Sequence, residues 1–144
     1  MQARPISADD AGLLGALAAG GLPTEDLGDP GRSFFAFEHE AGAVGYAGYE
    51  LCGTEVLLRS VVVLPEARGR GHGRAMTETL LGAAEAAGAR RAFLFSTDAA
   101  GYFARLGFVP IARTEAPASI LATRQAGSMC SSAALMTRRL GAHG

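Results

Sequence analysis

The six residues RGRGHG, at positions 68–73, combine three glycines with two arginines and a histidine. They follow the apolar run 60–64 and precede a stretch with helical spacing. Glycines at such a junction let the backbone approach a ligand closely, and the first free N–H groups of the helix then point at that ligand. The helix dipole and the nearby arginines favour an anion there, most naturally a phosphate. The alternative is a solvated Gly-rich turn.

Two better-known phosphate loops do not fit this stretch. A nucleotide P-loop needs Gly-Lys followed by Ser or Thr, and the chain contains no lysine. The dinucleotide pattern GxGxxG needs a different interval between its glycines. The loop is therefore expected to serve another phosphate-bearing ligand.

The elements around the loop predict an α/β (α+β) fold in one domain, residues 1–144, with a mixed sheet of six to seven strands and about four helices. The expected strands are residues 3–6, 33–39, 43–51, 54–64, 90–97, 108–112 and 131–139. The expected helices are residues 7–20 with Ser7 as N-cap, 74–87, 98–107 opened by Asp98, and 116–130. Strands 54–64 and 90–97 should run parallel, because the helix between them makes a right-handed crossover.

Composition narrows the classes of function. The 144 residues have a formal net charge of −1 and are 49% hydrophobic, so no global field attracts nucleic acid or a membrane surface. No apolar stretch reaches the roughly 20 residues of a membrane span, and the start has no secretory pattern. Cys52 and Cys130 are the only cysteines, with no CxxC and no clustered histidines. We expect a cytoplasmic protein without a disulfide framework or a preformed metal site.

The strand, the loop and the following helix together resemble the acyl-CoA-binding motif of the GNAT (GCN5-related N-acetyltransferase) family, Arg/Gln-x-x-Gly-x-Gly/Ala. Arg68, Gly71 and Gly73 meet that pattern, and Pro65-Glu66 precede it at the usual place. The segment YFARLGFVPI resembles the later helix, Gly-Phe and strand of the family, so the resemblance spans nearly the whole chain.

This resemblance implies acetyl-CoA as cosubstrate. It implies that the pyrophosphate lies on the N–H groups of residues 69–74, and that the pantetheine arm pairs with residues 61–63 where strands 54–64 and 90–97 splay apart. The cofactor-binding residues implied are Val61, Val62, Val63, Arg68, Gly69, Arg70, Gly71, His72, Gly73 and Arg74.

The family often supplies a tyrosine, four residues before the glycine of Gly-Phe, to protonate the departing thiolate. Phe103 occupies that position here, and Tyr102 lies next to it. One residue turns a helical side chain by about 100°. Tyr102 is thus either the general acid or part of an aromatic wall. No general base is evident, since Glu50 and Glu55 flank a turn and are most simply solvated.

Arg59 interrupts an apolar strand, where a regular alternation would put it on the same face as Val61 and Val63. A buried arginine is either part of an internal ion pair or a fork for a carboxylate or another oxyanion. Ser60 and Thr24, the latter in a loop that can close over a ligand, are the other candidate substrate contacts.

Within the family, the stretches GLPTEDL and APASILATRQAGSMCSSAALM resemble the group associated with arsenic-resistance operons. Relatives in that group include an enzyme that acetylates the α-amino group of arsinothricin. The resemblance implies a small anionic amine substrate and a role in arsenic resistance, for a monomer or homodimer. The alternative is a non-catalytic acetyl-CoA-binding module or a thiol-based arsenic sensor that uses Cys52 and Cys130.

Overall fold

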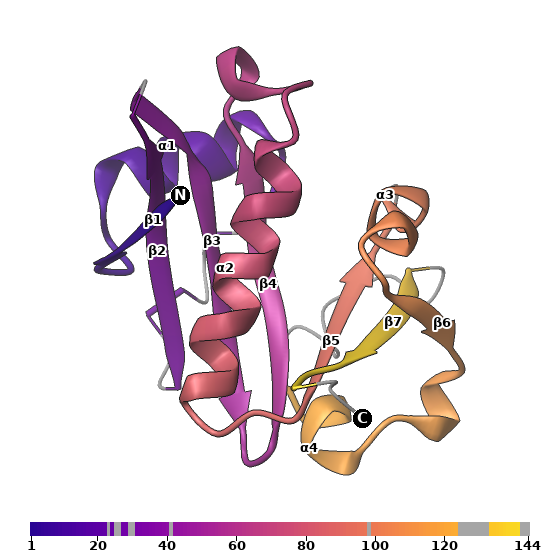
Figure 1. Ribbon diagram of the computed structural model, residues 1–144. Coiled ribbons are helices and arrows are strands. Elements are labelled where there is room, and N and C mark those ends of the chain that lie inside the picture. The colour runs from indigo at the N-terminus through magenta and orange to yellow at the C-terminus, as the bar shows by residue number, and fades with distance from the viewer. Residues whose placement is uncertain are drawn as a thin grey trace.

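The computed structural model describes residues 1–22, 24, 27–28, 31–40, 42–97, 99–123 and 133–141. These residues form a seven-stranded mixed sheet in the order β1-β2-β3-β4-β5-β7-β6 (Figure 1). The strands are β1 Gln2–Ile6, β2 Arg32–His39, β3 Gly42–Cys52, β4 Glu55–Val63, β5 Arg91–Ser96, β6 Val109–Ile111 and β7 Ala134–Arg139. The helices of the described residues are α1 Ala11–Ala19, α2 His72–Ala86, α3 Ala100–Arg105 and α4 Ala118–Leu121. The predicted fold class is confirmed.

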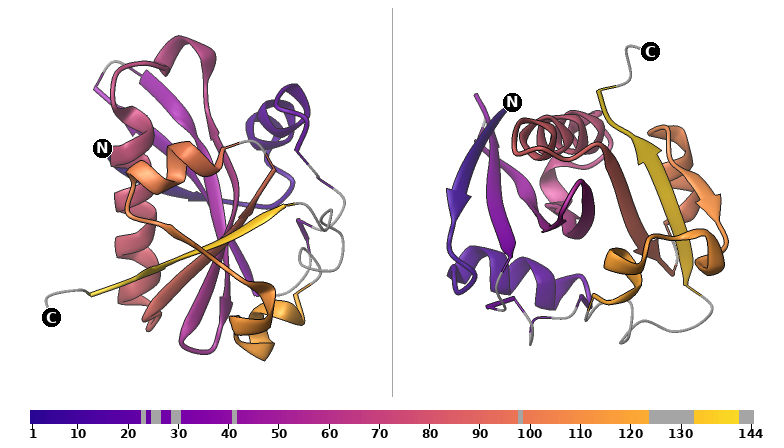
Figure 2. Two further views of the ribbon diagram at one scale, coloured as in Figure 1. Left: turned by 90° about the vertical axis from the view of Figure 1, so that its right-hand side faces the viewer. Right: turned by 90° about the horizontal axis from the view of Figure 1, so that it is seen from below.

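The helices cover both faces of the sheet, with α2 on one face and α1 and α4 on the other (Figure 2, right). Met76, Leu80 and Ala84 recur every four residues along α2 and are buried in the largest core cluster. On the opposite face, the α1 side chains pack around Phe34, and Ile120 of α4 packs in a separate cluster. No helix of the described part of the chain is long and apolar enough to cross a membrane.

Strands β4 and β5 pair in parallel over three residues only, from Glu55 opposite Arg91 to Leu57 opposite Phe93. Beyond this point each strand continues without the other, which confirms the predicted splay. Leu64 donates its N–H to the carbonyl of Val44 in β3, 2.8 Å away. Backbone groups along a strand point alternately to its two sides. Because the N–H of Leu64 points to β3, the N–H and C=O of Val63 point to the other side, into the gap between β4 and β5.

A bulge in β4 changes the face on which Arg59 lies. Gly48 of β3 is paired with Arg59 and Tyr46 with Val62, so one residue of β3 opposes two of β4. Ser60 occupies the bulge with a left-handed φ of 58°. Val61 and Val63 pack against the cluster under α2, whereas Arg59 faces the side of α1 and α4. The prediction that these three residues share a face was wrong, because the extra residue breaks the alternation.

The ends of the helices differ from the sequence predictions. Asp10, not Ser7, caps α1, because Asp10 Oδ1 accepts a hydrogen bond from the Leu13 N–H at 3.0 Å. Ser7 instead begins a turn, in which its carbonyl accepts from the Asp10 N–H. In the stretch 116–130 the structure shows α4 only, and residues 124–130 lie outside the described residues. Asp98, expected to open α3, also lies outside them.

Candidate active site

The Gly-rich loop leaves the N-terminus of α2 open. Gly69 and Gly71 have φ values of 78° and 76°, which non-glycine residues rarely adopt, and a Cβ on either would meet open space. Gly71 is the N-cap of α2, and no side chain caps the helix there. The first N–H groups of α2 thus remain available as donors at the positive end of the helix dipole. This geometry fits an anion such as a pyrophosphate.

A cleft of about 450 Å³ lies against this loop. One wall comes from the end of β4, the loop and the first turn of α2, and the other comes from α3. The lining residues are Val63, Ala67, Arg68, Gly69, Gly71, Gly73, Arg74, Tyr102, Arg105 and Leu106. The structure therefore brings together most of the residues that the sequence assigned to the cofactor, together with Tyr102.

Four of the predicted cofactor residues lie outside the cleft lining. The ring of His72 lies 5.2 Å from the ring of His39, at the end of β2, and Arg70 is exposed in the loop. Val61 packs against the cluster under α2, and Val62 packs against α1. For Val61 the backbone, rather than the side chain, is the part that remains relevant to a ligand in the gap, whereas Val62 pairs with Tyr46 of β3.

Of the three arginines that line the cleft, Arg68 and Arg74 are hydrogen-bonded to the backbone of its walls. Arg68 donates from Nε to Val63 O at 2.9 Å, so it lies on the strand edge that faces the gap. Arg74 donates from Nη2 to Arg105 O at 2.6 Å and joins α2 to α3. Both guanidinium groups add positive charge beside the open end of α2.

The hydroxyl of Tyr102 lies over the first turn of α2. A Cβ on Gly73 would overlap this hydroxyl oxygen and come within 3.1 Å of the Tyr102 Cζ. Only glycine therefore fits at position 73 beside Tyr102. Burial raises the pKa of Tyr102, against the lowering effect of Arg74 and Arg105. The hydroxyl is accordingly protonated and able to donate at neutral pH.

Unlike Tyr102, Phe103 points into the core, because of the hydrogen bonds that end α3. The Phe108 N–H bonds to Phe103 O and the Gly107 N–H bonds to Ala104 O, with Gly107 at φ 92°. These are the two hydrogen bonds of a Schellman motif, which places a hydrophobic contact between its first and last residues. The rings of Phe103 and Phe108 make that contact edge-on at 5.9 Å. The preceding residue, Tyr102, is thereby turned toward the cleft.

Of the candidate substrate residues, Arg59 lies on the face of the sheet away from α2. Arg59 is 4% exposed on β4, opposite Gly48, and adjoins the bulged Ser60. Thr24 is exposed in the connection between α1 and β2. The gap between β4 and β5 therefore has the cleft on one face of the sheet and Arg59 on the other.

Both carboxylates of the nearby turn already have partners. Glu50 lies 3.4 Å from the buried guanidinium of Arg32, its cross-strand neighbour on β2. Glu55 accepts hydrogen bonds from Thr54 at 2.8 Å and from Ser119 at 3.2 Å. These contacts give Glu50 and Glu55 structural roles at the lower end of β3 and β4.

Cys52 is an unreactive thiol. Burial raises its pKa to about 11, and the carboxylates of Glu50 and Glu55 act in the same direction, against Arg32. The thiolate is the form that binds metalloids and reacts with electrophiles. Cys130 lies outside the described residues.

We therefore expect Cys52 to alkylate slowly. In a Cys130→Ser variant, iodoacetamide at pH 8 should label Cys52 about 100-fold more slowly than an ordinary thiol, because the thiolate fraction falls tenfold per unit of pKa. Mass spectrometry over time measures the rate. Labelling as fast as that of glutathione would show that Cys52 is reactive.

Sequence reasoning missed several residues around the cleft. Leu106 and Arg105 line it from the end of α3, and Arg138 and Glu78 lie behind that wall. Residues 78 and 138 belong to α2 and β7 and meet only through the fold. No local pattern at either position could have predicted the contact.

Comparison with known proteins agrees with this geometry. The family model described as acetyltransferase (GNAT) domain matches residues 30–110, which is more than half of the chain. No curated protein sequence matches the chain.

Three solved structures illustrate the similarity of fold. The chain aligns with Tetrahymena GCN5 at a TM-score of 0.76 and 13% identity, over 96% of each chain. It aligns with N-acetylglutamate synthase from Neisseria gonorrhoeae, complexed with coenzyme A and N-acetyl-glutamate, at 0.75 and 19% identity, over 95% of this chain and 34% of that one. A GNAT-family acetyltransferase from Staphylococcus aureus Mu50 gives 0.71 and 17% identity, over 96% and 99%. With the family model, the seven-stranded sheet and the splayed β4 and β5, the chain belongs to the GNAT family of acetyltransferases, whose cosubstrate is acetyl-CoA.

Proposed function

We propose that this acetyltransferase transfers the acetyl group of acetyl-CoA to the amino group of a small anionic amino acid. We further propose that it acts in arsenic resistance, with an arsinothricin-like organoarsenical as its substrate. The observation that carries the substrate class is Arg59, a buried arginine on the face of β4 opposite the cofactor cleft. Residues 1–144 act as one domain in this proposal, and the cytoplasmic location stays a prediction.

On the donor side, the open N-terminus of α2 and the loop N–H groups of residues 69–74 hold the pyrophosphate. The backbone of Val61 and the N–H of Val63 offer their groups along the gap to the pantetheine arm, while Val63 O accepts from Arg68. The cleft fits this role because its walls supply uncapped N–H donors and three arginines without a carboxylate among the lining residues.

The reaction is a direct attack. The amine nitrogen of the acceptor attacks the thioester carbonyl carbon, the C–S bond breaks, and the nitrogen releases one proton to solvent. A free N–H on the edge of β4 polarises the carbonyl oxygen. Tyr102 donates its proton to the departing sulfur and regains one from water.

On the acceptor side, Arg59 binds the carboxylate or the arsinyl oxygens through its planar fork. Arg59 lies between the cluster of α1 and the cluster of α4, which keeps water away from it. The attraction between its guanidinium and the substrate anion is therefore strong. The structure of N-acetylglutamate synthase with N-acetyl-glutamate supports this class, since that fold holds an acidic amino-acid product.

The test is release of free CoA from acetyl-CoA by the purified chain, offered arsinothricin, phosphinothricin, glutamate and neutral amino acids. Turnover confined to the arsinyl and phosphinyl compounds is the expected result. Turnover on neutral amines of similar size would overturn the substrate class. Tight binding of acetyl-CoA without turnover on any amine would favour the non-catalytic alternative.

For Arg59→Lys we expect kcat/KM for the anionic acceptor to fall by about 10²-fold, because lysine keeps the charge but loses the bidentate fork. The Kd for acetyl-CoA, measured by calorimetry, should stay within about threefold. Arg32→Lys serves as the matched control, since Arg32 is a second buried arginine on the same face and contacts Glu50. Equal losses in both variants would show a structural effect instead.

A further inference from the structure

At the C-terminal end of α3, two backbone carbonyls accept hydrogen bonds from side chains of other elements. Its Schellman motif uses the carbonyls of Phe103 and Ala104. The carbonyls of Arg105 and Leu106, the next two, accept from arginine side chains instead, Arg105 O from Arg74 and Leu106 O from Arg138 at 3.0 Å. Cations at the C-terminal end of a helix also interact favourably with the helix dipole.

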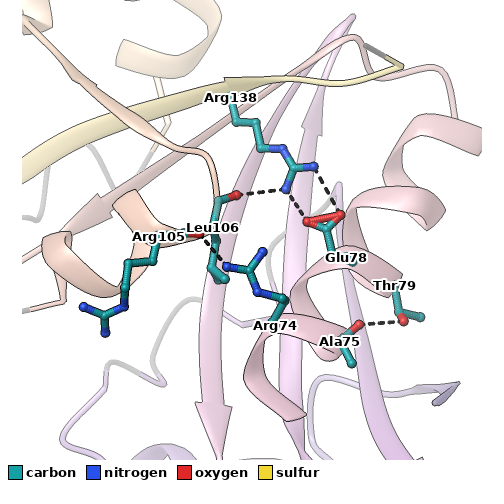
Figure 3. A network of polar contacts seen from close by, with 7 residues as sticks. All are labelled: Arg74, Ala75, Glu78, Thr79, Arg105, Leu106 and Arg138. Carbon is teal, nitrogen blue, oxygen red and sulfur yellow. Dashed lines mark hydrogen bonds and ion pairs between the residues drawn. The ribbon is translucent and has the colours of Figure 1, made fainter. Parts of the chain in front are cut away.

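Arg138 belongs to β7 and binds two elements at once (Figure 3). Its Nη1 donates to Glu78 Oε1 as well as to Leu106 O, and its Nη2 donates to Glu78 Oε2 at 3.1 Å. This is the bidentate fork that a lysine could not make. Glu78 lies one turn along α2 from Arg74, so both contacts from α2 reach the same end of α3.

These contacts lie directly behind the cleft. Arg105 and Leu106 belong to its α3 wall, and Gly73 and Arg74 to its α2 wall. The Tyr102 hydroxyl spans the two walls by resting over Gly73. The distance between α2 and α3 thus fixes both the width of the cleft and the position of that hydroxyl.

We infer that Arg74, Glu78 and Arg138 form a clamp that holds α3 against α2, and that Glu78 and Arg138 are positioning residues for acetyl-CoA binding and for Tyr102. The part that concerns Tyr102 as an acid rests on the proposed function. The part that concerns the width of the cleft stands on the geometry alone. The hydrogen bond from Arg138 lowers the pKa of Glu78, so its carboxylate is charged throughout the neutral range.

The test compares Arg138→Met and Glu78→Gln with Arg139→Met, which changes the exposed neighbour of Arg138 on β7. Calorimetry should show the Kd for acetyl-CoA raised about fivefold to tenfold in the first two variants and unchanged in the control. The double variant should bind no more weakly than Arg138→Met alone, because the two residues act as one unit.

A second readout needs neither cosubstrate nor acceptor. The chain has three tyrosines and no tryptophan, so the alkaline absorbance difference against Tyr102→Phe isolates the titration of Tyr102. In Arg138→Met, Tyr102 should titrate at a lower pH than in the parent protein, because burial is the main cause that raises its pKa. Loss of the positive charge of Arg138 would by itself raise the pKa of Tyr102, so a lower titration pH reports displacement of α3.

A lower thermal midpoint in Arg138→Met, with an unchanged Kd and an unchanged Tyr102 titration, would reduce the clamp to a structural contact and overturn the inference. If Arg138→Met does not fold, Glu78→Gln decides by the same two readouts. If the parent protein does not bind acetyl-CoA, the proposed function fails, while the Tyr102 titration still decides the clamp.

Discussion

Gly73→Val is expected to weaken acetyl-CoA binding by about 100-fold or more, because the added side chain overlaps the Tyr102 hydroxyl and covers the first N–H groups of α2. Calorimetric titration with acetyl-CoA measures the loss. Gly82→Val is the matched control, since Gly82 lies on the same helix and a Cβ there meets nothing within 4 Å. Normal binding by Gly73→Val would refute the phosphate-binding role of the loop.

A smaller substitution at the same position separates the steric effect from the loss of backbone donors. Gly73→Ala overlaps the hydroxyl but leaves the N–H groups in place. In combination with Tyr102→Phe the nearest remaining ring atom lies at 3.1 Å, a close contact that a small movement relieves. We expect the double variant to bind acetyl-CoA more tightly than Gly73→Ala alone. Weaker binding in the double variant would contradict the packing of Tyr102 on Gly73.

Tyr102→Phe is expected to lower kcat by about 10²-fold, near the lower end of the range for a general acid, because a thiol with a pKa of about 8–9 is a tolerable leaving group. The Kd for acetyl-CoA should change little, since the ring remains. Steady-state CoA release with the best acceptor measures kcat. Tyr49→Phe is the control, because Tyr49 is buried under α2 outside the cleft.

The pH dependence gives the same test a second arm. Burial raises the pKa of Tyr102 above its usual value of 10.0, so the hydroxyl keeps its proton below that pH. A rate that depends on this proton should therefore show no fall caused by Tyr102 between pH 7 and 9, and an alkaline decline only above pH 10. A decline near pH 8 that vanishes in Tyr102→Phe would contradict the environment described for Tyr102.

The sequence predicted the parts of the site that depend on the backbone. Glycines between a strand and a helix indicated a loop whose backbone can approach a ligand. The rule of right-handed crossovers then predicted that β4 and β5 run parallel. The tyrosine ambiguity had a local answer as well: Phe103, Gly107 and Phe108 have the spacing of a Schellman motif, which sends Phe103 into the core. This spacing is visible in the sequence itself.

Other features could not be predicted from local patterns. The bulge in β4 places a left-handed φ at Ser60, where a glycine would have been expected, so the period-2 alternation gave the wrong face for Arg59. The clamp joins Glu78 and Arg138, sixty positions apart, and both residue types are ordinary for the exposed side of a helix or a strand. Such pairs become visible only once the sheet order places β7 beside β5.

The bulge also bears on how new specificities arise in this chain. Before Ser60 and after it, β4 presents side chains in opposite phase, so a substitution at Arg59 changes the face of β4 away from α2 without changing what Val61 and Val63 pack against. Under the acceptor role proposed for Arg59, substitutions at this one position would change the preferred amine while the packing under α2 stays the same. A library confined to position 59 tests this separation, whereas position 60 carries the left-handed φ of the bulge.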